Sequence, residues 1–236
     1  MEAASHLVCW SHVVRQSVIE DYGIAPERVS VIRPAVARHR LPPRSVPAAD
    51  ARKLRLLFVG NDFARKGGHD VLATFESGLR ATCELDIVSN GIATLPAGAA
   101  ARLHRGLSST SAALAQLYAD ADVFVMPTHE DAFGIVFVEA MAAGLPCVGG
   151  RVLAVPELVQ HGATGYCVTP GDRQALQQAI EALRDDAGLR DRMGLAGRDF
   201  AERECDEFTN CAQWGSLFRR LAAEADLPLQ AQRVSA

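Results

Sequence analysis

The sequence predicts an α/β protein built on a doubly wound parallel sheet, and three observations support that prediction. Continuous apolar runs, such as LRLLFVG at 54–60 and DVFVMPT at 122–128, are typical of strands buried on both faces. Segments with apolar residues at helical spacing alternate with these runs. The chain has 236 residues and is 49% hydrophobic, which is enough for one sizeable core.

The elements follow one another in a regular order from residue 54. The expected strands are 54–60, 83–91, an extended piece near 104–106, 122–128, 146–150 and 165–170. The expected helices are 66–80, a short one around 97–103, 109–121, 133–144, and most of the chain from 172 on. Ser/Thr caps begin the helix at 109–121, and Gly144 ends the helix at 133–144.

The first residues do not belong to this alternation. A strand at 6–10, a helix at 11–23 and a strand at 28–36 precede a proline-rich linker at 37–53. The main domain is expected over 54–225, with a tail at 226–236. Between Arg33 and Arg55 the chain has seven Lys/Arg residues and one acid, Asp50. A solvated linker is the favoured interpretation, and a phosphate- or membrane-facing patch is the alternative.

Composition excludes several classes of function. The net charge of −4 predicts no nucleic-acid partner, and no apolar run reaches the length of a membrane span. The first ten residues lack the features of a signal peptide. The six cysteines form no C-x-x-C pair and the histidines are isolated, which predicts reduced thiols, no zinc site and a cytoplasmic protein.

The topology predicts where chemistry occurs. In the strand order 3-2-1-4-5, counted from residue 54, ligands bind at the carboxyl ends of the neighbouring strands 1 and 4. The loops that leave these two strands are GNDFARKGG (60–68) and PTHEDAFG (127–134). Both are polar and contain glycine, and neither matches a P-loop or a dinucleotide fingerprint. We therefore expect a binding site where these loops meet.

The residue types in these loops fit a phosphate ester with hydroxyl-bearing groups. Lys66 opens a helix and offers a positive charge, and residues 132–135 are expected to form a first helical turn with free N–H groups. Gly134 leaves room for a phosphate oxygen. Asp131 and Glu139 suit hydroxyl groups, because a carboxylate accepts hydrogen bonds from them. Together they predict a nucleotide sugar, although Glu139 alone could be an exposed residue with a salt-bridge partner.

At this point the sequence resembles the donor-binding C-terminal domain of the retaining glycosyltransferases of the GT-B fold, the group 1 or family 4 type. The stretch DAFGIVFVEAMAAGLPCV at 131–148 is similar to the E-x7-E block of that family. Three further segments extend the resemblance over about 54–220: LRLLFVGNDFARKGG, GLSSTSAALAQLYADADVFVMPT and VPELVQHGATGYCVTPGD. The resemblance implies the C-terminal half of a GT-B architecture.

The resemblance also implies roles for individual residues. Asp131 would bind the transferred sugar and Glu139 the ribose hydroxyls, while Lys66 would neutralise the diphosphate leaving group. Gly106 and Leu107 would lie near the base. Backbone N–H groups of Phe133, Gly134, Ile135 and Val136 would hold phosphate and sugar oxygens. The reaction would retain anomeric configuration by front-face attack, without a required metal or other cofactor.

Two departures from the family pattern affect the site. The first acid is Asp131 where the family has Glu, so its reach is shorter, and Glu130 is adjacent. Asn61 stands where the family usually has Arg, which removes a cation from the diphosphate; Arg65 is the nearby residue that could compensate. The sequence DAD at 120–122 resembles a D-x-D metal motif, but its place before an apolar strand favours a turn.

Length is the third departure. A two-domain GT-B enzyme needs on the order of 300 residues or more. Residues 1–36 resemble only the end of an acceptor domain and its hinge, and the helix at 207–225 is expected to expose Trp214, Phe218 and Leu221. The chain is thus expected to be a truncated product or one half of a split enzyme whose N-terminal domain is another chain. It would act in the cytoplasm, with the inner membrane face as a further location.

The acceptor is open at this stage: a glycan, a lipid or a small molecule. Two other functions are also open. The first is a non-catalytic nucleotide-sugar-binding module or remnant, which the length and Asn61 favour. The second is a nucleotide-sugar epimerase on the same fold, which the EAMAAGLP block makes the weaker alternative.

Overall fold

The structure is a computed structural model that describes residues 4–44 and 52–225. Part of the expected linker and the whole expected tail therefore lie outside the described residues. The main body is a six-stranded, all-parallel sheet in the order β5-β4-β3-β6-β7-β8. Its strands are β3 (Leu54–Val59), β4 (Cys83–Val88), β5 (Arg102–His104), β6 (Val123–Met126), β7 (Cys147–Gly150) and β8 (Gly165–Val168).

This order confirms the prediction of a doubly wound sheet. Counted from residue 54, the strands run 3-2-1-4-5, and β8 adds a sixth strand at the far edge. The chain reverses direction between β3 and β6, which pair directly through Leu56 with Val123 and Leu57 with Phe124. All four of these side chains are at most 1% exposed. The buried run of apolar residues is what requires helices on both faces.

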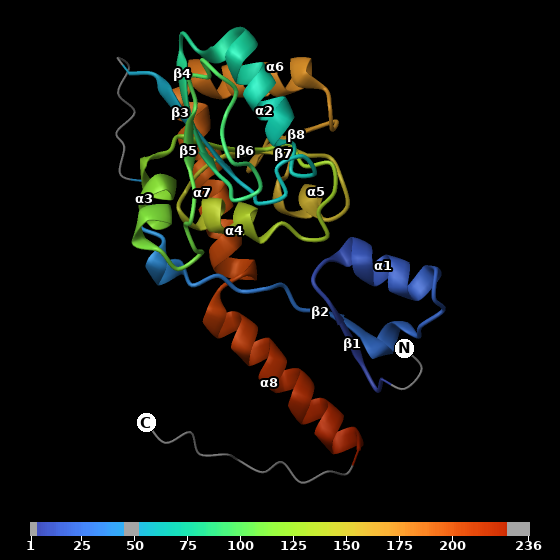
Figure 1. Ribbon diagram of the computed structural model, residues 1–236. Coiled ribbons are helices and arrows are strands. Elements are labelled where there is room, and N and C mark those ends of the chain that lie inside the picture. Colours follow the sequence, from blue (N-terminus) through green and yellow to red (C-terminus); the bar gives the residue numbers. More distant parts are fainter. Residues whose placement is uncertain (1–3, 45–51, 226–236) are drawn as a thin grey trace.

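The helices that cover the sheet are α2 (Gly68–Thr74), α3 (Ala112–Asp120), α4 (Ile135–Ala142), α5 (Val155–Leu158), α6 (Arg173–Asp185) and α7 (Ala187–Glu204). Helix α2 packs against α6, and α4 packs against α7 (Figure 1). Ser111 caps α3 by accepting a hydrogen bond from the Leu114 amide, as its sequence predicts. Gly144 follows α4 with φ +85°, which confirms the expected glycine stop.

Three local expectations were wrong. No helix forms at 97–103, because Pro96 and Gly98 (φ +79°) make a turn and β5 then begins at Arg102. Helix α2 begins at Gly68, so Lys66 precedes the helix, and a π-helical turn at Phe75–Leu79 continues it. Helix α4 begins at Ile135, two residues later than expected, because Gly134 adopts φ +83° before it.

The N-terminal residues form a separate small unit beside the main body (Figure 1). It consists of β1 (Leu7–Cys9), α1 (His12–Glu20), the 3-10 turn η1 (Pro26–Arg28) and β2 (Val29–Val31). The two strands pair in parallel with each other and with no strand of the large sheet. Glu157 of α5 joins this unit to the main body, because its carboxylate accepts hydrogen bonds from the His12 and Val13 amides and pairs with Arg33.

The basic residues between 33 and 55 are largely ion-paired rather than solvated. In the described part of the chain, acidic partners exist for five of them: Arg33, Arg38, Arg44, Arg52 and Arg55. A short 3-10 helix, η2 (Arg38–Arg40), interrupts the expected linker. All five pair with acids of the main body. Arg33 pairs with those at 157 and 204, and the other four pair with those at 84, 122, 191 or 202.

Helix α8 (Glu207–Glu224) extends away from the sheet and lies next to the N-terminal unit (Figure 1). A groove lined by β2 and α8 residues separates the two, and the Asn210 side chain donates a hydrogen bond to the Arg33 carbonyl oxygen. Phe218 is 56% exposed, as expected, whereas Trp214 and Leu221 are partly buried. In the described ranges, no helix has the length and apolar character needed to cross a bilayer.

Candidate functional site

The loops after β3 and β6 meet at the carboxyl edge of the sheet, as the topology predicts. Gly67 packs so closely that a Cβ placed there would lie 2.4 Å from the Pro127 carbonyl oxygen. The Arg65 carbonyl oxygen accepts hydrogen bonds from the His129 amide (2.8 Å) and the Thr128 hydroxyl (3.2 Å). Because both loops are tied together by backbone contacts, the side chains they carry have fixed relative positions.

A cavity of about 480 Å³ opens where these loops join. Of the eleven residues predicted for the site, nine line it: Asn61, Lys66, Leu107, Asp131, Phe133, Gly134, Ile135, Val136 and Glu139. Gly106 and Arg65 are the exceptions, and Arg65 has other partners. The Arg65 guanidinium pairs with Asp62 (2.8 Å) and donates to the Glu130 carbonyl oxygen (2.8 Å), outside the cavity lining.

Lys66 and Asp131 form an ion pair inside the cavity. Their Nζ and Oδ2 atoms are 2.5 Å apart, and their side chains are 17% and 9% exposed. The other carboxylate oxygen of Asp131 accepts a hydrogen bond from the Phe133 amide at 3.2 Å. The Phe133 N–H group is therefore occupied in this structure, and the Lys66 charge is already shared with a carboxylate.

The N-terminus of α4 supplies free amide groups to the same cavity. Gly134 is the N-cap in the left-handed region, where glycine is favoured, and a Cβ there would lie 2.7 Å from the Phe137 ring. The amides of Gly134, Ile135 and Val136 donate to no acceptor among the described residues. Unsatisfied N–H groups at the positive end of a helix favour an anionic ligand.

Glu139 lies one turn further along α4 and has a different partner. The Tyr118 hydroxyl donates a hydrogen bond to Glu139 Oε2 at 2.9 Å, and Tyr118 is fully buried. Burial raises the pKa of the Glu139 carboxyl, and the hydrogen bond from Tyr118 opposes that rise. Burial, with the nearby Glu139 charge, raises the pKa of Tyr118 well above its usual range. Within the described residues, Glu139 Oε1 accepts no hydrogen bond, so it is available to a ligand.

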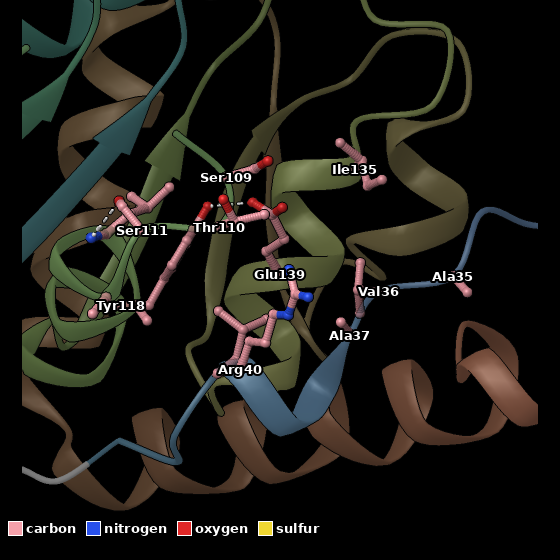
Figure 2. A pocket seen from close by; sticks show the side chains of 14 residues that line it. Ala35, Val36, Ala37, Arg40, Ser109, Thr110, Ser111, Tyr118, Ile135 and Glu139 are labelled. Carbon is pink, nitrogen blue, oxygen red and sulfur yellow. Dashed lines mark hydrogen bonds between the residues drawn. The ribbon is translucent and has the colours of Figure 1, made fainter. Parts of the chain in front are cut away.

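A second cavity of about 400 Å³ meets the first at Glu139. Figure 2 shows Glu139 and Tyr118 joined by their hydrogen bond, with Ser109 and Thr110 beside them. Arg40 reaches from η2 toward Glu139 in the same view, and it has no acidic partner among residues 4–44 and 52–225. Glu139 therefore lines both cavities, whereas Lys66 lines only the first and Arg40 only the second.

Asn61 stabilises a neighbouring loop rather than presenting a charge. Its side-chain oxygen accepts a hydrogen bond from the Asn90 amide at 2.9 Å. The Asn90 side chain in turn accepts a hydrogen bond from the Gly106 amide at 2.8 Å. These two contacts connect the ends of β3, β4 and β5 and hold the loop that contains Leu107 against the cavity.

The D-x-D pattern at 120–122 is a helix-to-strand junction, as predicted. Helix α3 ends at Asp120 and β6 begins at Val123. The Asp122 carboxylate accepts two hydrogen bonds from Arg52 and one from the Arg55 amide. Its oxygens are thus used to bind the segment before β3 to the sheet.

Sequence reasoning missed three residues that contribute to the site. Trp10 lines the main cavity from the N-terminal unit, and Arg40 lines the second cavity from the expected linker. Tyr118 is the hydrogen-bond donor to Glu139 although 21 residues separate them. A helical position of Tyr118 facing the sheet could have indicated burial, but no local pattern indicates its partner.

Comparisons with known proteins agree with this architecture. Residues 53–186 match the family model described as "Glycosyl transferases group 1". Glycogen synthase of Mycobacterium tuberculosis is 32% identical over 212 residues, which cover 84% of this chain and 49% of that protein. N-acetyl-alpha-D-glucosaminyl L-malate synthase of Bacillus anthracis is 41% identical over 87 residues, covering 36% of this chain and 23% of that protein.

Solved structures share the fold at low identity. Sucrose-phosphate synthase from Thermosynechococcus elongatus superposes with a TM-score of 0.82 at 22% identity, covering 94% of this chain and 60% of that one. The Anabaena protein HepE in complex with UDP-glucose gives a TM-score of 0.78 at 19% identity, with 92% and 64% coverage.

These comparisons determine both the family and the extent of the match. The chain spans about half the length of two curated relatives, 49% of glycogen synthase and 50% of a D-inositol 3-phosphate glycosyltransferase of Streptomyces bingchenggensis. Its six-stranded sheet is the Rossmann-like half of a GT-B fold. The chain belongs to the group 1 glycosyltransferases, the family 4 type that its E-x7-E block resembles.

Proposed function

We propose that this chain supplies the donor-binding half of a retaining glycosyltransferase that uses a nucleoside-diphosphate sugar. The observation that carries the proposal is the shared cavity. Lys66, Asp131, Glu139 and the free N-terminus of α4 all line it, so that a cation, two carboxylates and unsatisfied amides face one ligand. These groups match a diphosphate with hydroxyl-bearing rings on both sides.

Each group has a role in this proposal. Glu139 accepts hydrogen bonds from ribose hydroxyls through its free Oε1, while Tyr118 holds Oε2. The amides of Ile135 and Val136 bind the diphosphate together with Lys66. Asp131 binds hydroxyls of the transferred sugar. Leu107 contacts the base. The order along the cavity is then base, ribose, diphosphate and sugar.

The reaction would use the leaving group as its own base. The bond between the anomeric carbon and the diphosphate oxygen breaks, and an acceptor oxygen forms a new bond on the same face of the sugar. The acceptor proton passes to the departing phosphate oxygen. Lys66 and the α4 N-terminus stabilise the negative charge that develops on that phosphate. Asp131 is not assigned as a nucleophile, because Lys66 pairs with its Oδ2 and the Phe133 amide with its other oxygen.

Lys66 and the helix N-terminus supply the positive charge that a metal ion supplies in other transferases. We therefore propose donor binding without a metal or other cofactor. Equal affinity for the nucleotide with and without EDTA would support this, and a loss of binding in EDTA would overturn it. The UDP-glucose bound to HepE makes UDP-glucose the first donor to test.

A second function is favoured by one observation. Asn61 is committed to Asn90 and presents no charge to the diphosphate. A nucleotide-sugar-binding module without transfer activity would retain the cavity but stabilise the leaving group less. Both functions predict nucleotide binding, and release of UDP from UDP-glucose in the presence of an acceptor distinguishes them. The UDP-release measurement also requires the acceptor-binding surface, and therefore the partner chain or domain that carries it.

The test of the proposal is a binding panel. UDP, GDP, ADP and their glucose conjugates are titrated against the chain by calorimetry, with thermal shift as a first screen. We expect one nucleotide to stabilise the fold. We expect Glu139→Ala to weaken its binding by about tenfold or more, because a charge-assisted hydrogen bond contributes roughly 1.5–3 kcal/mol.

Two controls accompany the panel. Glu139→Gln keeps the volume and the contact with Tyr118, so it separates loss of charge from loss of packing. Glu27→Ala removes an exposed glutamate of η1 outside the cavity and should leave binding unchanged. Unchanged affinity in both Glu139 variants, or no response of the folded wild-type protein to any nucleotide, would overturn the proposal.

A further inference from the structure

Trp10 is an exposed aromatic residue at the mouth of the main cavity, and the function proposed above does not use it. Its side chain is 55% exposed although it lines the same cavity as Asp131 and Gly134. Its ring lies against Phe133 in an edge-to-face arrangement, with centroids 6.2 Å apart and planes at 73°. A large apolar surface left open beside polar groups is typical of a binding surface.

The position of Trp10 is held firmly by its neighbours. Ser11 is fully buried and caps α1 through a hydrogen bond from the Val14 amide. Glu157 accepts hydrogen bonds from the amides of His12 and Val13 at 3.0 and 2.7 Å. The same Glu157 carboxylate pairs with Arg33, which also pairs with Glu204. The exposure of Trp10 is therefore a fixed feature of the docked N-terminal unit.

The polar edge and the apolar face of a pyranose match the side chains at this end of the cavity. A pyranose ring presents hydroxyl groups at its edge and C–H groups on its face. Asp131 accepts hydrogen bonds from hydroxyls, and the indole of Trp10 is a flat apolar surface for the C–H groups. Ile135, which is 44% exposed, adds apolar surface beside them in the same cavity.

In the proposed arrangement, Trp10 lies at the end of the cavity that holds the sugar and not at the end that holds the base. In the proposed arrangement the nucleoside lies at Glu139 and Leu107, and the diphosphate lies at Lys66 and the α4 N-terminus. Both Phe133, which the Trp10 ring contacts, and Asp131 belong to the loop before α4. Trp10 is thus on the sugar side of the phosphates rather than on the base side.

We propose that Trp10 is a sugar-binding residue whose indole stacks on the C–H face of a pyranose that Asp131 holds by its hydroxyls. This inference rests on the proposed donor function. The pyranose comes from one of two sources, the donor sugar or a sugar of the acceptor. The chemistry that recognises either one is the same, so the experiment distinguishes them.

The chain offers a direct readout, because it has two tryptophans. Trp214 lies on α8 against Phe218, with ring centroids 5.5 Å apart, and does not line the cavity. In the variant Trp214→Phe, the fluorescence therefore reports on Trp10 alone. This variant is titrated first with UDP, then with UDP-glucose, and finally with methyl α-D-glucopyranoside added to the UDP-glucose complex.

If the donor sugar stacks on Trp10, UDP-glucose changes the emission and UDP does not. Trp10→Ala then weakens binding of UDP-glucose by about three- to tenfold, and leaves binding of UDP within twofold. Trp10→Phe keeps an aromatic face and recovers part of the loss. If an acceptor sugar stacks there, UDP-glucose leaves the Trp10 emission unchanged. The added pyranoside then changes that emission.

The remaining outcomes overturn the inference. If UDP and UDP-glucose bind but neither UDP-glucose nor the pyranoside alters the Trp10 emission, Trp10 does not bind a sugar. If Trp10→Ala weakens UDP and UDP-glucose equally, Trp10 acts on the shape of the cavity only. If no nucleotide binds the folded chain, the proposed donor function is wrong as well. The UDP titration alone distinguishes this result from a failure of the Trp10 proposal. Phe218→Ala, an exposed aromatic on α8, is the matched control.

Discussion

The two acidic residues of the site balance their charges in different ways. Asp131, in the loop before α4, lies 2.5 Å from the Lys66 ammonium group. Glu139, in the middle of α4, faces the uncharged hydroxyl of Tyr118 at 2.9 Å. The first carboxylate has an opposite charge beside it and the second has only a hydrogen-bond donor. Burial raises the pKa of Glu139, and no cation contacts it among the described residues.

This difference indicates a division of work between the ends of the cavity. The Lys66–Asp131 pair is a structural contact, and in the proposed donor function its lysine also supplies the charge that the diphosphate needs. Glu139 is less well satisfied in the free protein, because one oxygen has no partner in the described chain and burial disfavours its charge. A ligand that supplies hydroxyl donors would complete it. The contacts that Glu139 gains from such a ligand would stabilise the complex and not the free protein.

The largest effect is expected from removing the cation. In Lys66→Met, Asp131 loses its opposite charge while 9% of its side chain is exposed, so we expect a lower Tm by several degrees. Nucleoside-diphosphate affinity should fall by about tenfold or more, because a charge-assisted contact contributes roughly 1.5–3 kcal/mol. Calorimetry with UDP and thermal unfolding measure the two effects.

The double variant Lys66→Met/Asp131→Asn separates the structural role from the binding role. Removing the unpaired charge should recover much of the lost Tm but not the affinity. Lys53→Met is the matched control, since Lys53 is the other lysine and, within the described ranges, its Nζ hydrogen-bonds only to the Arg80 carbonyl oxygen. If the double variant binds UDP as well as wild type does, Lys66 serves the fold alone and the comparison fails.

An intermediate effect is expected at the other acid, and it depends on pH. In the proposed function, binding needs an ionised Glu139, so affinity should be present above the pKa of this carboxyl and be lost as pH falls through it. Burial already raises that pKa, and the Tyr118 hydroxyl opposes the rise. In Tyr118→Phe the opposing hydrogen bond disappears. The midpoint of the affinity loss should therefore move to higher pH, with affinity at pH 8 within a few-fold of wild type.

The measurement is UDP affinity between pH 5 and 8 for both proteins. Tyr166→Phe serves as the control, because Tyr166 packs on His161 and lies outside both cavities. Coincident midpoints, or a midpoint that moves to lower pH, would show that the Tyr118 contact does not set the charge of Glu139.

The positions of Asp131 and Glu139 could be predicted from the sequence because they follow from local rules. Apolar runs such as 122–128 read as buried strands, and parallel strands bring their carboxyl-end loops to one edge. The partners of these acids could not be predicted in the same way. The contact between Tyr118 and Glu139 depends on how two helices pack over the sheet, and the place of Trp10 depends on docking of the N-terminal unit through Glu157.

The false helix at 97–103 has a related cause. Its alanines favour a helix, but Pro96 and the positive φ of Gly98 make a turn there, and Arg102 enters β5 through pairing with Asp86. Arg102 also binds the Asp86 carboxylate. Strand pairing and a half-exposed ion pair thus outweigh helix propensity over a segment of a few residues.

The smallest effect is expected at Arg65, the cation that the sequence offered as a replacement for the arginine missing at Asn61. Its guanidinium pairs with Asp62, and its side chain is 40% exposed, as is typical of contacts worth less than about 1 kcal/mol. We expect Arg65→Ala to leave UDP affinity within twofold and Tm within about 2 °C. Affinity measured by calorimetry, next to Lys66→Met, tests this.

A tenfold loss in Arg65→Ala would give the opposite conclusion. It would mean that the guanidinium leaves Asp62 and the Glu130 carbonyl oxygen to reach the diphosphate when the nucleotide binds. Asp62→Ala would then increase the affinity, because it frees Arg65 from its partner. If Arg65 is inactive, the proposed function leaves Lys66 and the α4 amides to stabilise the leaving-group charge alone. Because Asn61 adds no charge, we then expect a weaker stabilisation than two cations would provide.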